Sequence, residues 1–178
     1  MDMHIVASAL AQYLTRMYEA EGMPLEKPIR IVAQDPAYTV RDRQILSELP
    51  VPIEVVTDPQ GFLAIDESSL VYSAFAMVPT KQIVADLAAA APDGKGPAAL
   101  FVNSDFRDKI YGNVDRAVYK RDDPRRFVDP ETKRYLTMLE SYTRVMDGQK
   151  LIGMFYLDTF PMDAYYWFTG MDMWARGE

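Results

Sequence analysis

The sequence contains no cysteine, and His4 is its only histidine among 178 residues. The absence of cysteine excludes disulfides, thiolate zinc sites and cysteine nucleophiles. One histidine provides no set of imidazole ligands for a transition metal, and a Ser-His-Asp triad would have to use this residue near the start of the chain. We therefore expect no metal site, and we expect His4 to be exposed or weakly capping rather than catalytic.

Long apolar runs and a surplus of positive charge are also missing. No stretch approaches the roughly 18 apolar residues that cross a bilayer, and the start, MDMHIVASALAQYL, lacks the basic flank of a signal peptide. The net charge of −7 opposes non-specific nucleic-acid binding, because phosphate neutralisation needs an excess of lysine and arginine. We expect a cytoplasmic protein, with the nucleus as the alternative, that binds neither membranes nor nucleic acid.

Basic residues are nevertheless concentrated in one part of the chain. Nine of the 19 lysines and arginines lie between Arg107 and Arg134, interleaved with aspartates and glutamates. This mixture favours a solvated surface segment over an anion-binding site.

Short β-branched runs alternate with helical patterns along the chain. Strands are predicted at residues 29–34, 52–56, 69–75 and 98–104. The first helix is predicted from Ile5 to near Gly22, with an apolar stripe at helical spacing that consists of Ile5, Val6, Ala9, Leu10, Tyr13, Leu14 and Met17. Further helices are predicted after a capping box of Thr39 and Asp42 and from Pro79-Thr80. The last begins at Asp129-Pro130-Glu131, with Asp129 as its N-cap and a buried stripe of Tyr135, Leu136, Leu139, Tyr142 and Met146. Residues 151–176 are interpreted as two strands around an aromatic connection. The pattern predicts a single α/β domain over residues 1–178, with a mainly parallel sheet, helices on both faces and a C-terminal antiparallel strand pair.

Acidic residues follow several of the predicted strands. Ligands of parallel α/β sheets bind outside the carboxyl ends of the strands, where the sequence places Asp35, Asp58 and Asp105. We predict Asp35, Asp58 and Tyr38 as acid–base groups, since crowded or buried carboxyls acquire a raised pKa. The predicted substrate contacts are Tyr72, Phe75, Asn103, Asp105, Tyr111 and Trp167. The alternative is that Asp35 and Asp58 cap turns while the tyrosines pack in the core.

The segment FYLDTFPMDAYYWFTGMDMW is rich in aromatic residues and methionine. Such side chains fill irregular apolar space and also form adaptable binding surfaces. Core packing, a dimer interface and a lid over an apolar ligand all remain open. Because aromatics and methionine are enriched at interface cores, we expect a homodimer.

Three segments, AQDPAYTVRDRQIL, DESSLVYSAFAMVPTKQIVADL and DPETKRYLTMLESY, resemble the SRR1-like family, particularly its fungal members. The resemblance covers about residues 5–150 and implies a Rossmann-like fold similar to that of methyltransferases. Longer relatives carry a strand and a glycine-containing turn before the first helix, so the resemblance implies an N-terminally shortened chain. Without those glycines the backbone has no close approach to a nucleotide. We therefore predict no cofactor, with NAD and S-adenosylmethionine binding lost.

Two functions remain open on this basis. The first is a small-molecule-binding α/β protein, a cofactor-independent acid–base enzyme of isomerase, cyclase or lyase type acting on an apolar metabolite. The second, which the resemblance implies, is a noncatalytic regulatory or protein-interaction module. A closed, desolvated pocket that holds an acid with a raised pKa favours the first. A shallow crevice at the strand ends beside a large exposed aromatic patch favours the second.

Overall fold

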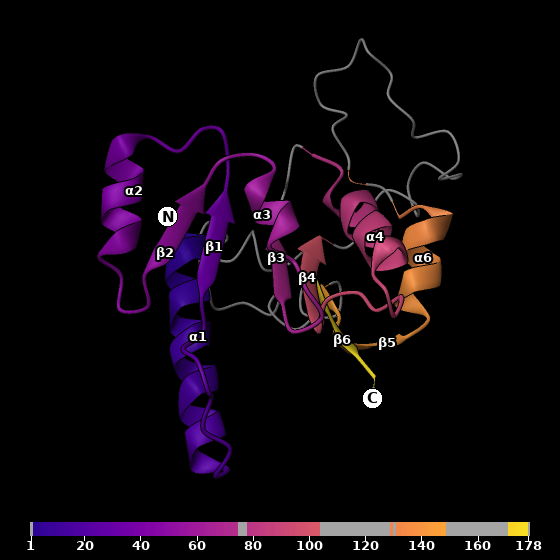
Figure 1. Ribbon diagram of the computed structural model, residues 1–178, viewed down its shortest axis with the longest axis horizontal. Helices are drawn as coiled ribbons and strands as arrows, with labels where there is room; N and C mark the ends of the chain where they lie inside the picture. Colours follow the sequence, from indigo (N-terminus) through magenta and orange to yellow (C-terminus); the bar gives the residue numbers. More distant parts are fainter. Residues whose placement is uncertain (1, 75–77, 104–128, 130, 149–170, 178) are drawn as a thin grey trace, which may run out of the picture. The chain divides into compact units, whose positions relative to one another are not determined.

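The computed structural model describes residues 2–74, 78–103, 129, 131–148 and 171–177 of a mixed α/β chain (Figure 1). The chain divides into two compact units, residues 1–64 and 65–178, and each is described by itself. The single domain expected over residues 1–178 stays a prediction. Within the described ranges, no helix is both long and apolar enough to cross a membrane.

The first unit contains two parallel strands and three helices. In chain order these are α1 (Asp2–Ala20), β1 (Ile31–Gln34), α2 (Val40–Ser47), β2 (Ile53–Val56) and α3 (Gln60–Leu63). The register places Ile31 opposite Ile53 and Gln34 opposite Val56, so the carboxyl ends of both strands lie at one edge. The structure confirms both predicted strands and the long helices, whereas the four-residue α3 was not predicted.

Helix α1 ends as predicted but buries a different side. The chain leaves it through Gly22, whose φ of 73° favours glycine because this residue has no Cβ. The buried positions are the small residues Ser8 and Ala11, and the Ser8 hydroxyl bonds both the N–H and the carbonyl of Val51, at 3.0 and 3.1 Å. Tyr13, which the apolar periodicity assigned to the buried stripe, is 59% exposed. Small side chains allow the close approach that the larger apolar residues would block.

Helix α2 begins with the predicted capping box. The Thr39 hydroxyl accepts a hydrogen bond from the Asp42 N–H at 3.2 Å, and the Asp42 carboxylate accepts one from the Thr39 N–H at 2.8 Å. These bonds satisfy N–H groups that have no partner within the helix. The capping box is therefore confirmed.

The second unit is built on a four-stranded mixed sheet. Its elements are β3 (Leu70–Ser73), α4 (Thr80–Ala90), β4 (Ala99–Asn103), α6 (Lys133–Leu139), β5 (Tyr142–Met146) and β6 (Met171–Arg176). The strand order is β3-β4-β6-β5, with β3 and β4 parallel and β6 antiparallel to both of its neighbours. The sheet is therefore not mainly parallel. Strand β6 confirms the second of the two predicted C-terminal strands, and residues 151–170 lie outside the described part of the chain.

Helices α4 and α6 share one hydrophobic core with this sheet. The core contains Val71, Leu100, Val102 and Tyr142 from the strands, and Val84, Ala85, Tyr135 and Leu139 from the two helices. Burying one large apolar side chain contributes about 1.5–3 kcal/mol to stability. Packing on this face therefore fixes α4 and α6 against the sheet.

The prediction that the last helix continues through Met146 is wrong. Helix α6 ends at Leu139, and residues Tyr142–Met146 form β5. Tyr142 is buried as predicted, but its hydroxyl donates to the Pro97 carbonyl at 2.5 Å and its backbone pairs with β6. Helical spacing predicted the burial correctly, whereas pairing with a strand far along the sequence decided the backbone conformation.

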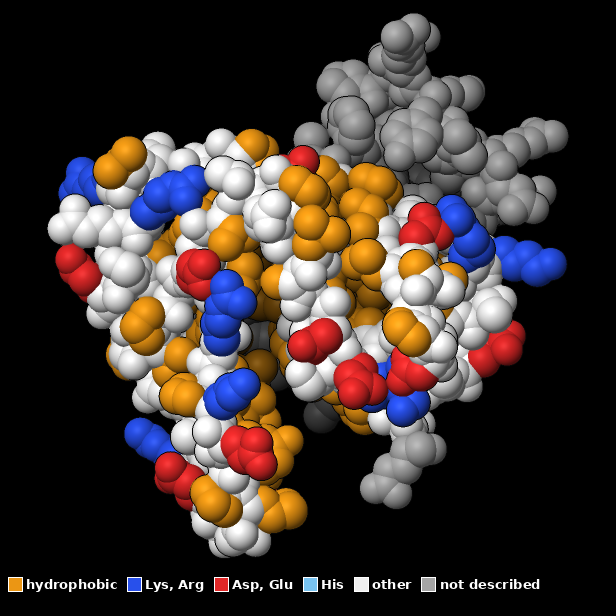
Figure 2. All heavy atoms as spheres, viewed as in Figure 1, with side chains coloured by type: hydrophobic (Ala, Val, Ile, Leu, Met, Phe, Trp, Pro, Cys, Tyr) orange, Lys and Arg blue, Asp and Glu red, His pale blue; other side chains and the backbone are white. Residues whose placement is uncertain are grey.

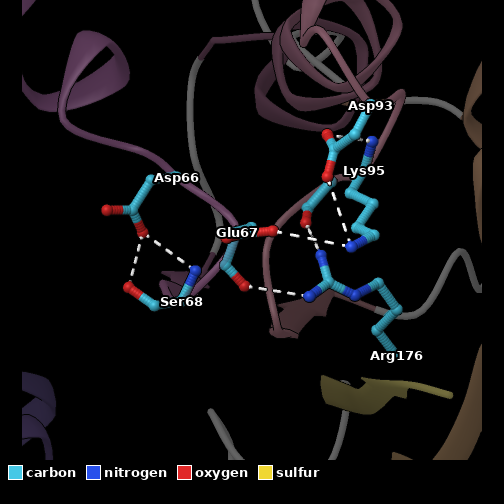
Figure 3. Close-up of polar contacts among 7 residues, drawn as sticks. Asp66, Glu67, Ser68, Asp93, Lys95 and Arg176 are labelled. Carbon is cyan, nitrogen blue, oxygen red and sulfur yellow. Dashed lines mark hydrogen bonds and ion pairs between the residues drawn. The ribbon is translucent and has the colours of Figure 1, made fainter. Parts of the chain in front are cut away.

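Arg176, at the end of β6, contacts the loops that precede β3 and β4 (Figure 3). Its guanidinium donates to the carbonyls of Gly96 and, at 3.2 Å, Glu67. The Lys95 ammonium lies 3.8 Å from the Glu67 carboxylate and 3.3 Å from that of Asp93. These exposed contacts join the loops before β3 and β4 to the last strand, which is a structural role.

Candidate functional site

The predicted acids of the first unit lie at the carboxyl ends of β1 and β2 and make local contacts. One oxygen of Asp35 accepts the Ala37 N–H at 2.8 Å, which closes the turn after β1. Asp58 accepts the side-chain N–H of Gln34 at 2.8 Å, and the Gln34 oxygen accepts the Gly61 N–H at 2.7 Å. Both carboxylates are exposed. These contacts are the turn-forming alternative that the sequence left open.

Tyr38 contacts the only histidine of the chain. The Tyr38 hydroxyl lies 2.5 Å from His4 Nε2, so His4 is half-buried against the loop after β1 rather than exposed. Burial raises the pKa of Tyr38, and the negative charges of Asp35 and Asp42 raise it further. The Tyr38 hydroxyl therefore remains protonated at neutral pH. The proton-transfer roles predicted for Asp35, Asp58 and Tyr38 stay predictions.

Tyr72 and Asn103 lie in β3 and β4, on the face opposite α4 and α6. Tyr72 stands opposite Phe101 in the parallel register, and the two rings stack with centroids 5.0 Å apart. Alternation along a strand gives Asn103 the same face as Phe101. Burial raises the pKa of Tyr72 to about 12. The other predicted contacts, Phe75, Asp105, Tyr111 and Trp167, lie outside the described residues, so the set of substrate contacts stays a prediction.

On the helix-covered face, the second unit contains a group of buried and half-buried ionisable residues that the sequence did not reveal. We call it the buried polar cluster, and it consists of Lys81, Asp129, Glu131, Tyr135 and Asp172. Asp172 of β6 stands opposite Val102 near the carboxyl end of β4, and the Ser73 hydroxyl at the end of β3 donates to Thr80 at the start of α4, at 3.2 Å. The cluster therefore lies near the carboxyl ends of the parallel strands β3 and β4, where α/β sheets bind ligands.

Lys81 is the buried cation of this cluster. Its side chain is only 2% exposed, and its ammonium lies 3.7 Å from a Glu131 carboxylate oxygen and 5.6 Å from the centre of the Tyr135 ring. Burying a charge is costly unless an opposite charge or a polar partner compensates. The surrounding carboxyls and the aromatic ring provide this compensation.

Asp129 caps α4 rather than the helix that follows it. Its carboxylate accepts the Lys81 N–H at 2.7 Å, while the N-cap residue of α4, Pro79, makes no side-chain cap. Thr132 caps α6, so the prediction that Asp129 does so is wrong. The free N–H groups of α4 attract the carboxylate from 48 positions away. Burial nevertheless raises the pKa of Asp129 to about 6, outweighing the hydrogen bonds and the Lys81 charge.

Tyr135 and Asp172 complete the cluster. Burial and the charges of Glu131, Asp129 and Asp172 raise the pKa of Tyr135, so its hydroxyl remains a proton donor. Asp172 accepts the Gly148 N–H at 3.0 Å, and burial raises its pKa despite the Arg144 guanidinium 3.7 Å away. Among the described residues, neither the Tyr135 hydroxyl nor Asp129 Oδ1 has a hydrogen-bond partner.

These features suit proton transfer. Carboxyls whose pKa is raised by burial, beside a specific charged partner, are typical of acid–base sites. Within the described ranges, no group of three or more histidine, aspartate and glutamate side chains is arranged to hold a metal ion. The Asp129-Pro130-Glu131 motif was a visible signal, but no local pattern revealed its contact with Lys81.

A family model described as the SRR1 domain matches residues 8–136, which is 129 of the 178 residues. The chain belongs to the SRR1 domain family. The match includes Asp35, Asp58, Lys81, Asp129 and Tyr135, and it ends before β5 and β6. A search of curated proteins and a search of solved structures found no match. The family resemblance is thus confirmed, whereas fungal origin and N-terminal shortening stay predictions.

Proposed function

We propose that this SRR1-domain protein binds a small metabolite with an apolar body at the buried polar cluster and transfers a proton to and from it. It is a cofactor-independent enzyme of the isomerase, cyclase or lyase type, and Asp129 is its acid–base group. The observation that carries this proposal is the partly buried Asp129 carboxylate, which accepts the Lys81 N–H at 2.7 Å in surroundings that raise the pKa of the carboxyl to about 6.

A carboxyl with this pKa has both protonation states available near neutral pH. General acid–base catalysis is most effective when the pKa of the group lies close to the working pH. In an isomerisation, the Asp129 carboxylate takes a proton from one substrate atom and returns it to another, so the reaction needs no oxidant, reductant or second substrate. The Lys81 N–H and hydrogen bonds from Gln82 hold the carboxylate in place. Asp129 Oδ1, which has no hydrogen-bond partner among the described residues, is the oxygen that would contact the substrate.

A Rossmann-like arrangement is part of this proposal. Parallel pairing of β1 with β2 and of β3 with β4 supports it, as do the helices α2 and α4 that follow β1 and β3. Sheets of that kind bind ligands at the carboxyl ends of their strands, which is where Asp172 and the start of α4 lie.

Solvent exchange tests the reaction without knowledge of the substrate. The protein is incubated in D₂O with a panel of apolar carbonyl metabolites, and deuterium entering their carbon–hydrogen bonds is followed by NMR. We expect exchange with at least one compound, a loss of at least 100-fold in Asp129→Asn, and no change in Glu140→Gln. Glu140 is an exposed carboxyl at the end of α6 and serves as the matched control.

The same experiment compares the two candidate acids. If Asp35→Asn abolished exchange and Asp129→Asn left it intact, the reaction would belong to the first unit. Exchange that is equal in the wild type and both variants would contradict an enzymatic role for either carboxyl.

An exposed apolar side of α1 favours a second candidate, a noncatalytic interaction module that associates with another copy of itself. Ile5, Tyr13 and Met17 are 51%, 59% and 39% exposed, and apolar side chains are visible along α1 in Figure 2. Tyr13→Glu should then convert a dimer to a monomer in sedimentation experiments. Tyr18→Glu should not, because Tyr18 is also exposed but points to the other side of α1. A monomeric wild type would rule this candidate out.

A further inference from the structure

Two buried oxygen atoms of the cluster lack a hydrogen-bond partner among the described residues, Asp129 Oδ1 and the Tyr135 hydroxyl. Tyr135 is only 1% exposed, and its ring lies beneath the Lys81 ammonium. Buried polar groups in folded proteins bond to protein, water or ligand, because leaving them unpaired is costly. These two atoms therefore define what a ligand group must offer.

The two oxygens have different requirements. The Tyr135 hydroxyl is held neutral by burial and by the neighbouring carboxylates, so it needs an acceptor. Asp129 Oδ1 needs a donor when the carboxyl is ionised, and the carboxyl itself donates when protonated. When Asp129 is ionised, a ligand hydroxyl meets both requirements, because it accepts a hydrogen bond from Tyr135 and donates one to Asp129 Oδ1. When Asp129 is protonated, a ligand carbonyl oxygen meets both requirements, because it accepts a hydrogen bond from each group. An ammonium cannot accept the tyrosine proton, and a carboxylate cannot donate to Asp129.

The charges around the cluster also select against anions. Among the described residues, the carboxyls of Asp129, Glu131, Asp147 and Asp172 surround the cations Lys81 and Arg144. Arg144 lies 3.1 Å from Asp147 and 3.7 Å from Asp172, and Lys81 lies 3.7 Å from Glu131. Both cations are thus already compensated. A carboxylate or phosphate entering the site would therefore lie beside these carboxyls, and Lys81 and Arg144 already have carboxylate partners.

We infer that the buried polar cluster recognises an uncharged oxygen group of its ligand, a hydroxyl or a ketone, between Tyr135 and Asp129, and that it rejects ligands with a carboxylate or phosphate at this position. This inference rests on the proposed function, because it names the substrate class of the same site.

Four fragments that share a six-membered ring test it: cyclohexanol, cyclohexanone, cyclohexylammonium and cyclohexanecarboxylate. Each is titrated at pH 7 into the full-length ¹⁵N-labelled protein, and the Lys81 and Gly148 amide signals are followed, since both N–H groups bond carboxyls of the cluster. We expect the alcohol or the ketone to bind most tightly. Tyr135→Phe should weaken that binding by about two- to tenfold, the effect of losing one hydrogen bond, while Tyr18→Phe, which removes an exposed hydroxyl, should not.

Each other outcome overturns the inference. Tightest binding of the ammonium or of the carboxylate would reverse the assigned charge preference. Binding that is unaffected by Tyr135→Phe, with a native-like spectrum for the variant, would show that the hydroxyl is not a ligand contact. If no fragment moved the two signals, the pair of oxygens would be satisfied by buried water. Deuterium exchange measures proton transfer separately. Exchange can therefore be observed while the expected fragment preference is not, and the fragment preference can be observed without exchange.

Discussion

Asp129 connects two segments that lie far apart in the sequence, because its carboxylate accepts the Lys81 N–H while its backbone leads toward α6. The same burial that makes it an effective cap raises its pKa to about 6. Capping an exposed helix favours the ionised carboxylate, whereas burial favours the neutral acid. In this cluster, burial has the larger effect on the protonation equilibrium.

The raised pKa of Asp129 predicts a specific pH dependence of stability. A folded-state pKa of about 6 against an ordinary value of 3.8 means that the fold prefers the protonated carboxyl. This contribution is fully present below about pH 4 and is lost as the pH rises through 6. We expect the free energy of unfolding of the wild type, relative to Asp129→Asn, to fall by up to about 3 kcal/mol between pH 4 and 7. Urea unfolding at a series of pH values measures it, and a constant difference would refute it.

Tyr142 provides a second test at the level of one atom. Its hydroxyl donates to the buried Pro97 carbonyl, which a phenylalanine would leave unpaired. We expect Tyr142→Phe to lower the free energy of unfolding by about 1–3 kcal/mol, measured by urea denaturation. Tyr13→Phe removes an exposed hydroxyl and should change it by less than about 0.5 kcal/mol. Equal effects of the two variants would show that this hydrogen bond contributes nothing.

At the scale of elements, Gly148 determines how closely the end of β5 approaches β6. A Cβ on this residue would meet the Met171 carbonyl oxygen and lie 2.6 Å from the Met171 nitrogen, and both are backbone atoms that a rotamer change cannot move. The absence of a side chain also allows the Gly148 N–H to reach Asp172 at 3.0 Å. The glycine is therefore required by close packing rather than by a special backbone angle.

We expect Gly148→Ala to destabilise the second unit by about 3 kcal/mol, because β6 has to shift to make room. Thermal unfolding measures the loss. Gly177→Ala is the matched control, since the added atom would lie at an ordinary distance of 3.7 Å from the Ser141 carbonyl. If the two substitutions were equally mild, the contact between Gly148 and Met171 would not be tight in solution.

At the scale of the whole molecule, the family match and the division into units differ in extent. The SRR1 match runs without interruption from residue 8 to residue 136, across the boundary between units at residues 64 and 65. A domain that is continuous in sequence is expected to unfold cooperatively, which agrees with the single domain predicted from chain length.

Differential scanning calorimetry tests this expectation. We expect one transition in which the calorimetric and van't Hoff enthalpies agree, with a total of about 120 kcal/mol near 60 °C for 178 residues. Two separable transitions, only one of which responds to Gly148→Ala, would show instead that the two units are independent domains.

Local signals in the sequence were sufficient for much of the fold. The start of α2 follows from the side chains of Thr39 and Asp42, and the end of α1 follows from Gly22. The family could likewise be recognised from short motifs. These features depend on residues a few positions apart, whose interactions are the same wherever the segment lies.

Only the tertiary structure decided the fate of residues 142–146 and the buried side of α1. Tyr142 fits a helical stripe and a strand equally well, and antiparallel pairing of this segment with β6 selects the strand. The buried polar cluster depends on the same kind of long-range contact. Lys81, Asp129 and Asp172 acquire their environment from packing between distant segments, and a pKa set by burial has no signature in local sequence.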